Sequence, residues 1–212
     1  MDKHGLLFLN GEVNEQEIQQ IQSSKFDQII AADGGTFNAL KWGFTPDVVV
    51  GDLDSIDDAV RLRLPQTIFI RRPSQQRNDF EKALMYCQEK AFSHLTILGI
   101  AGKRLDHALN NLSVLARYDQ NFHLQIYDSY SRIYLLRDQM TIQGIPGQLV
   151  SLIPLGKVDG IVTEGLAYPL NNEPLAFGIR EGLSNYLTHE TAHIRIERGL
   201  LFVFVHYTES GR

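Results

Sequence analysis

The first 127 residues alternate short apolar runs with helix-like segments, and this alternation constrains the fold more than any other feature. The apolar runs lie at residues 6–10, 28–32, 47–50, 67–70, 95–100 and 123–128. Strands that helices cover on both faces read as continuous apolar runs, whereas half-exposed strands alternate strictly between apolar and polar residues. The pattern therefore predicts an α/β fold with a Rossmann-like parallel sheet between two layers of helices.

Apolar residues at helical spacing mark two of the intervening segments. Ala83, Leu84 and Cys87 fall on one face of a segment from about residue 80 to 90. A segment that starts at residue 105 has apolar residues at helical spacing, namely Leu105, Ala108, Leu109, Leu112, Leu115 and Ala116. Such faces are typical of amphipathic helices. We expect both helices to cover the sheet.

The pattern changes after about residue 129. Short strand-like runs follow at close spacing, Gly and Pro punctuate them, and no helical period is evident. This is typical of an antiparallel sandwich or barrel. The sequence therefore predicts an α/β domain over residues 1–130 and an all-β sandwich domain over residues 131–212.

Composition limits the classes of function. A net charge of −5 and the absence of a Lys/Arg run argue against a nucleic-acid partner, but not against a nucleotide site. The apolar run near the N-terminus is too short for a membrane span, so no membrane partner is expected. Cys87 is the single cysteine, which excludes a disulfide within the chain. We expect a cytoplasmic protein.

Polar residues follow several of the predicted strands directly. Ligands of open α/β sheets bind beside the carboxyl ends of the strands, where such loops meet. The loops at residues 33–35, 51–55, 71–79 and 99–107 are therefore expected to form one cleft.

The loop at residues 51–55 carries two carboxylates. If the chain stays extended, Asp52 and Asp54 point the same way and Leu53 points into the core. Mg²⁺ binds carboxylate, phosphate and water oxygens, so this pair is consistent with a magnesium–phosphate site. A solvated acidic turn explains the same residues equally well.

Residues in the other loops also allow both a ligand-binding and a purely structural interpretation. Gly34 and Gly35 after Asp33 allow an anion close to the backbone, or form only a strand-to-helix turn. Asp79 fits a helix N-cap, which does not exclude metal binding. Arg104 lies beside glycines at an expected helix start, a suitable place for an anion.

Taken together, the loops resemble one family. The stretches AADGG, GFTPDVVVGDLDSI, NDFEKAL and GKRLDHALNNL, with EGLAYPL and GLSN in the second half, resemble thiamine pyrophosphokinases in order and spacing. The resemblance implies a homodimer of chains with an α/β and a β-sandwich domain. It also implies transfer of pyrophosphate from ATP to the hydroxyl of thiamine, with Mg²⁺, to give thiamine diphosphate and AMP.

The resemblance also implies roles for individual residues. The catalytic and metal-binding residues are Asp52, Asp54 and Asp79. The residues on the ATP side are Asp33, Gly34, Gly35, Ser55, Asn78, Arg104, Asp106 and His107. The residues on the thiamine side are Gln75, Ser184 and Asn185. Taken alone, His107 is more often structural than catalytic, and an aromatic partner for thiamine is left open among Trp42, Tyr168 and Tyr186.

The chain departs from the family pattern in two loops. Ser74 and Gln76 stand where the family usually has acidic residues, and Asn78 stands in place of a threonine. The loop is therefore less negative. Lys103 replaces a usual glycine, either as a phosphate contact or as a surface residue, and the sequence favours the surface.

Two other functions fit some of the same residues. A phosphohydrolase of the haloacid-dehalogenase type carries D-x-D-x-[ST] after a strand, with the first aspartate as nucleophile. That motif normally follows the first strand, whereas two strands precede Asp52. A nucleotide-sensing module without turnover is the second alternative.

Overall fold

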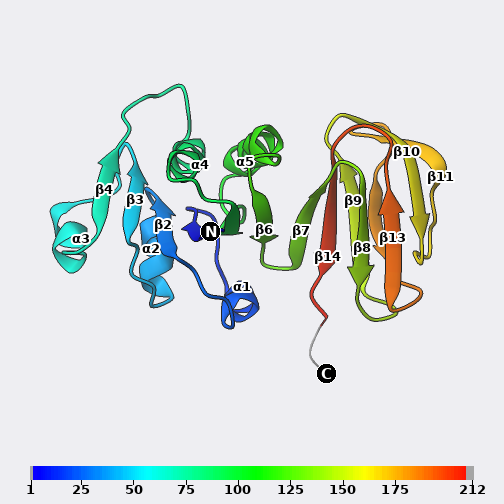
Figure 1. Cartoon of the computed structure of the whole chain (residues 1–212), viewed down its shortest axis with the longest axis horizontal. Coiled ribbons are helices and arrows are strands. Elements are labelled where there is room, and N and C mark those ends of the chain that lie inside the picture. The colour runs from blue at the N-terminus through cyan, green and yellow to red at the C-terminus, as the bar shows by residue number, and fades with distance from the viewer. Residues whose placement is uncertain (1, 209–212) are drawn as a thin grey trace. The chain divides into compact units, whose positions relative to one another are not determined.

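The structure, a computed structural model, describes residues 2–208. The chain divides into two compact units, Met1–Ser129 and Tyr130–Arg212. Strands and helices alternate through the first unit (Figure 1), in the order β1 (His4–Phe8), α1 (Glu15–Ile21), β2 (Gln28–Ala32), α2 (Gly35–Lys41), β3 (Val48–Gly51), α3 (Asp58–Arg63), β4 (Ile68–Arg71), α4 (Asp79–Glu89), β5 (His94–Leu98), α5 (Leu105–Tyr118) and β6 (His123–Tyr127).

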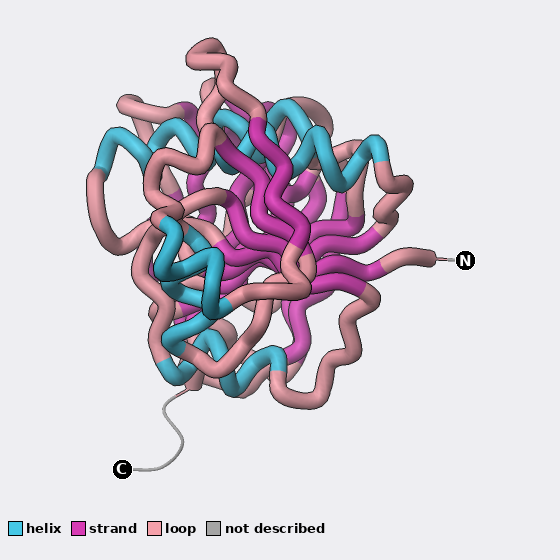
Figure 2. Tube along the Cα trace, turned by 90° about the vertical axis from the view of Figure 1, so that its left-hand side faces the viewer, coloured by secondary structure: helices cyan, strands magenta, loops and turns pink. Residues whose placement is uncertain are grey.

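The strands of the first unit form a parallel arrangement. Their order is β6-β5-β1-β2-β3-β4, and neighbouring strands pair in parallel. β3 is buried along its whole length, and β1 and β5 are buried after their first residue. Helices lie on both sides of these strands (Figure 2). Burial on both faces explains why the strands read as continuous apolar runs.

Helix α5 differs from the expectation. Its buried residues are Asn111, Val114 and Leu115, whereas Leu105 and Leu109 are 73% and 54% exposed. The predicted apolar face is therefore buried at Leu115 but wrong at Leu105 and Leu109, because only the second half of the helix is packed. Helix α4 follows the prediction, with Ala83, Leu84 and Cys87 buried.

The second unit consists of strands. They are β7 (Ser131–Leu136), β8 (Gln139–Gln143), β9 (Leu149–Pro154), β10 (Lys157–Glu164), β11 (Asn171–Ala176), β12 (Gly182–Tyr186), β13 (Thr191–Arg195) and β14 (Leu201–His206). Two antiparallel sets, β12-β9-β14-β7 and β11-β10-β13-β8, contribute to one buried apolar cluster. The chain thus has a mixed α/β fold with a large sheet and a second, antiparallel sheet.

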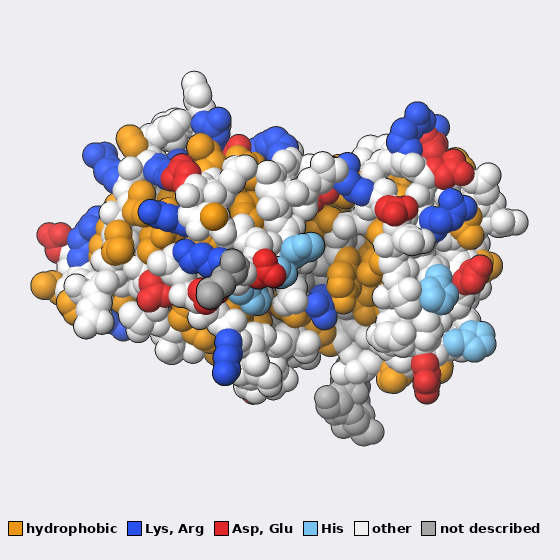
Figure 3. Space-filling view, in the orientation of Figure 1, with side chains coloured by type: hydrophobic (Ala, Val, Ile, Leu, Met, Phe, Trp, Pro, Cys, Tyr) orange, Lys and Arg blue, Asp and Glu red, His pale blue; other side chains and the backbone are white. Residues whose placement is uncertain are grey.

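Side chains of both charges lie on the visible surface. On the face in Figure 3, basic and acidic side chains are interspersed across both units. Within residues 2–208, no helix combines the length and the apolar character needed to cross a membrane.

Candidate functional site

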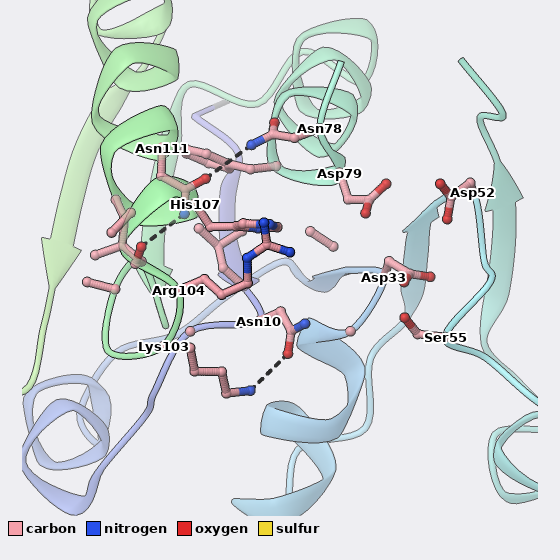
Figure 4. A pocket seen from close by; sticks show the side chains of 18 of the residues that line it. Asn10, Asp33, Asp52, Ser55, Asn78, Asp79, Lys103, Arg104, His107 and Asn111 are labelled. Carbon is pink, nitrogen blue, oxygen red and sulfur yellow. Dashed lines mark hydrogen bonds between the residues drawn. The ribbon is translucent and has the colours of Figure 1, made fainter. Parts of the chain in front are cut away.

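A pocket lies at the carboxyl ends of the strands in the first unit (Figure 4). Residues from the loops after β1, β2, β3 and β5 line it, together with residues at the start of α4 and along α5. Parallel strands end at the same sheet edge, so loops that are distant in sequence meet there. The polar side chains in its lining are Asn10, Asp33, Asp52, Asp54, Ser55, Asn78, Asp79, Lys103, Arg104, His107 and Asn111.

Three of the carboxylates form a cluster that suits a cation. Asp33, Asp52 and Asp54 each offer an oxygen, and these oxygens lie within 4.8 Å of one another. Asp33 is 3% exposed, and its Oδ1 atom is buried without a hydrogen-bond partner. A buried polar atom without a partner costs free energy that a bound ion recovers. Carboxylates arranged in this way match the preference of Mg²⁺ for oxygen ligands.

The pKa of Asp33 also indicates that the carboxylate cluster suits a cation. Burial raises the pKa of its carboxyl, and the charges of Asp79, Asp54 and Asp52 raise it further, against the lowering effect of a hydrogen bond from Ser55. Proximity of like charges disfavours ionisation. A cation between these groups would reverse that balance and hold them ionised.

Asp79 lies apart from the cluster of three and is held by a buried lysine. Lys82 Nζ is 2.8 Å from Asp79 Oδ1 and 3.7 Å from Asp52 Oδ2, and the Lys82 side chain is 4% exposed. Partial burial raises the pKa of Asp52, but a backbone hydrogen bond from Asp54 and the charge of Lys82 outweigh it, so this pKa is lowered. The hydrogen bond from the Gln75 side chain acts in the same direction.

Sequence reasoning missed Lys82, although a signal was available. Lys82 follows Asp79 by three residues on α4, which places both side chains on one face of the helix. The helix is capped by Asn78, whose side chain accepts a hydrogen bond from the Glu81 backbone at 2.9 Å. The expectation that Asp79 is the N-cap was therefore wrong, and its carboxylate instead lines the pocket and pairs with Lys82.

The backbone around the cluster is turned rather than extended. β3 ends at Gly51, and Leu53 has a left-handed φ of +66° and is partly exposed. The expectation that Leu53 points into the core was therefore wrong. Strained backbone of this kind is tolerated where its surroundings fix it. The turn still brings the carboxylates of Asp52 and Asp54 together.

Glycines allow close packing around the site. A Cβ on Gly51 would lie 2.7 Å from Asp33 Cβ and 3.1 Å from Asp79 Oδ1. A Cβ on Gly35 would lie 2.1 Å from the Phe8 carbonyl oxygen. Gly34 lines the pocket, and Gly35 seats the start of α2 against β1.

The wall opposite the carboxylates carries basic side chains. Lys103, Arg104 and His107 come from the loop after β5 and the start of α5 (Figure 4). Arg104 is paired with the exposed Asp106, which does not itself line the pocket. Lys103 is exposed and also lines the pocket, so the surface position expected from the sequence and a place in the pocket wall both apply to it.

Asparagines connect the loops; Asn78 was expected at the site, whereas Asn10 and Asn111 were missed by the sequence reasoning. Asn78 donates a hydrogen bond to Asn111 Oδ1 at 3.2 Å, and Asn111 donates to the Ile100 carbonyl at 2.9 Å. This chain ties the start of α4 to α5 and to the loop after β5. Asn10 contacts Lys103 in a similar way. These contacts link loops far apart in sequence, so spacing alone gave no signal for them.

The residues expected on the thiamine side do not line this pocket. Ser184 and Asn185 lie on β12 in the second unit. Ser184 is exposed with a φ of +57°, and buried Asn185 accepts from and donates to the backbone of Tyr168 at 3.0 and 2.8 Å. Tyr168 and Tyr186 lie edge to face with centroids 6.0 Å apart. Trp42 donates to the Val13 carbonyl, which indicates a structural role.

Family models match both units. A model described as the catalytic domain of thiamin pyrophosphokinase matches residues 20–127, and one described as its vitamin B1 binding domain matches residues 138–201. A thiamine pyrophosphokinase of Bacillus subtilis is 27% identical over 181 residues, which cover 82% of this chain and 85% of that protein. Thiamine pyrophosphokinase 1 of Arabidopsis thaliana is 28% identical over 188 residues, covering 77% and 67% of the two chains.

Solved structures show the same fold. A crystal structure of the Bacillus subtilis thiamine pyrophosphokinase matches with a TM-score of 0.81 at 23% identity, covering 97% of this chain and all of that one. A thiamin pyrophosphokinase from Candida albicans matches with a TM-score of 0.82 at 18% identity, covering 97% and 90%.

Proposed function

The chain belongs to the thiamin pyrophosphokinase family, and from this premise we propose how its residues serve the reaction. It transfers a pyrophosphoryl group from ATP to the hydroxyl of thiamine, which gives thiamine diphosphate and AMP. The observation that carries this assignment is the match of both family models, in chain order, to the two compact units. A phosphohydrolase or a nucleotide sensor leaves the match of the second unit unexplained.

We propose that Mg²⁺ binds at the acidic wall. Asp33, Asp52 and Asp54 would hold it, and the partnerless Asp33 Oδ1 is the observation that fits a cation there. When bound, Mg²⁺ neutralises charge on the phosphate oxygens of ATP. Asp79 acts beside this set, because its contact with Lys82 fixes both side chains at the edge of the cluster.

The remaining polar groups orient the nucleotide. Arg104 and His107 face the acidic wall across the pocket, and the triphosphate would lie between these cationic and carboxylate-lined walls. Ser55, Asn78 and Gly34 line the same space. Fixed charges of this kind stabilise the transition state of phosphoryl transfer more than covalent participation does.

The transfer is a substitution at the β-phosphorus. The thiamine hydroxyl oxygen forms a bond to that phosphorus, the bond to the α,β-bridging oxygen breaks, and AMP leaves with the electron pair. The hydroxyl proton passes to a carboxylate, for which Asp54 and Asp79 are the candidates in the pocket.

We assign the first unit as a Rossmann-like ATP domain and the second as a β-sandwich that binds thiamine and forms a homodimer. Support comes from the parallel strands of the first unit, the shared core of the two antiparallel sets in the second, and the vitamin B1 binding model over residues 138–201. Gln75, Ser184 and Asn185 are the proposed thiamine-side residues. The single buried cysteine fits a reducing, cytoplasmic setting.

Incubation of the protein with ATP, Mg²⁺ and thiamine tests the function. We expect AMP and thiamine diphosphate to form together. Release of inorganic phosphate without thiamine would indicate a phosphohydrolase instead, and binding of ATP without any product would indicate a sensor.

A further inference from the structure

Two loops beside the pocket are joined by a contact outside the acidic cluster. Lys103 Nζ donates a hydrogen bond to Asn10 Oδ1 at 3.0 Å, and both residues line the pocket (Figure 4). Asn10 lies in the loop after β1 and Lys103 in the loop after β5, so the contact spans neighbouring strands of the sheet. It therefore places an ammonium group at a fixed point of the pocket wall.

The loops on both sides of this contact are tightly held. The backbone N–H of Gly11 donates to the Gly99 carbonyl at 2.8 Å. Asn38 donates to the carbonyls of Leu9 and Gly11 at 2.6 and 2.8 Å, which fixes the residues that flank Asn10. Because these contacts hold the loop, the side chain of Asn10 has few positions available beside Lys103.

The residue before Lys103 is constrained as well. Gly102 has a φ of +96°, and a Cβ there would lie 2.4 Å from Glu12 Cβ. The turn at Gly102 directs the chain so that Lys103 reaches Asn10. A glycine is required for that backbone conformation.

Among the described residues, Lys103 forms no ion pair. Arg104, the other Lys or Arg in the lining, is paired with Asp106, whereas within residues 2–208 Lys103 contacts an uncharged amide and no carboxylate. An amide positions an ammonium without neutralising it. Lys103 thus places its ammonium group beside a space whose opposite wall carries the carboxylate cluster.

We propose that Lys103 binds the polyphosphate chain of the nucleotide and that Asn10 is its positioning residue. This inference rests on the proposed function, because the acidic wall alone would repel an anion unless it holds a cation. Lys103 then contacts the phosphate oxygens that face away from the carboxylates.

Calorimetric binding of ATP, inorganic tripolyphosphate and adenosine, each with Mg²⁺, tests the proposal. A charge-assisted hydrogen bond predicts about 10- to 100-fold weaker binding of ATP and tripolyphosphate by Lys103→Met, with adenosine unchanged. Lys103→Arg should restore most of the loss. Lys90→Met, which removes an exposed lysine at the end of α4, is the matched control and should bind like wild type.

A second pair of variants tests the role of Asn10. Asn10→Ala should weaken ATP binding by about 2- to 10-fold in wild type and have no effect in the Lys103→Met background, because its action passes through Lys103. Equal losses in both backgrounds would overturn the positioning role. Wild-type affinity for tripolyphosphate in a folded Lys103→Met protein would overturn the proposal.

These experiments test the proposed function separately from the role of Lys103. If wild type forms no thiamine diphosphate, the function fails, and the binding comparison still decides the role of Lys103. If wild type turns over and Lys103→Met keeps its KM for ATP, the function holds and the role of Lys103 is refuted.

Discussion

Replacing Asp33 with asparagine should stabilise the ion-free protein while removing its response to Mg²⁺. Asp33 is buried, its Oδ1 atom has no hydrogen-bond partner, and two further carboxylates of the cluster lie within reach. Asparagine has the same shape without the charge, and its amide can donate to those neighbours. The variant therefore removes an electrostatic cost that the native side chain bears until a cation binds.

The size of the effect follows from that environment. A buried polar group without a partner costs about 1–3 kcal/mol, so Asp33→Asn should raise the unfolding free energy of the ion-free protein by about that amount near pH 7. For a chain of this length each kcal/mol corresponds to about 2–4 °C in Tm. Mg²⁺ at about 100 times its Kd should add about 2.7 kcal/mol to wild type and little to the variant.

Thermal unfolding with EDTA and with Mg²⁺ measures both effects. Because the pKa of Asp33 is raised in the folded protein, wild type loses stability as the pH rises through that pKa, and the variant does not. The advantage of the variant should therefore vanish in acid. Asp58→Asn, an exposed carboxylate on α3, is the control and should shift stability by less than about 0.5 kcal/mol. An ion-free variant no more stable than wild type, or one equally stabilised by Mg²⁺, would refute the reasoning.

Three further changes follow from the same geometry. Lys82→Met removes the cation between Asp52 and Asp79 and should cost about 1–2 kcal/mol in EDTA, because both carboxylates keep some contact with water; unchanged urea unfolding would contradict this. Burial raises the pKa of Glu17 to about 7, so the stability that this carboxyl group adds to the folded protein is full below about pH 4.5 and is lost as the pH rises through 7. Urea unfolding at pH 5 and 8.5 should show this loss of unfolding free energy in wild type and not in Glu17→Gln. Equal losses in both proteins would argue against this role of Glu17. Gly51→Ala should displace two of the pocket's carboxylates, costing about 1–3 kcal/mol and the stabilisation by Mg²⁺; retention of that stabilisation in calorimetry would exclude the expected displacement.

The parts of the fold that depend on local pattern could be predicted from the sequence. Apolar strands in alternation with helices indicated the parallel sheet, and the loops after the strands indicated where Asp33, Asp52 and Asp54 would gather. What could not be predicted depends on tertiary contacts. The burial of Lys82 between two carboxylates requires α4 to be placed beside β3.

Helix α5 also shows that tertiary packing could not be predicted from local sequence spacing. Its spacing marked Leu105 and Leu109 as a packing face, but a helix contacts the sheet only where it passes over it, and both residues are exposed. The contact of Asn10 with Lys103 likewise joins loops 93 residues apart, which no local pattern reveals.

Product analysis of a small set of variants tests the central claim most directly. Wild type with ATP, thiamine and Mg²⁺ should form AMP and thiamine diphosphate in equal amounts, and Asp58→Asn should match it. Asp52→Asn and Asp79→Asn should each lower the rate of AMP formation by about 10²–10³-fold, because each removes a fixed charge beside the triphosphate. Near-wild-type turnover in either variant, or release of phosphate without thiamine diphosphate, would contradict the account.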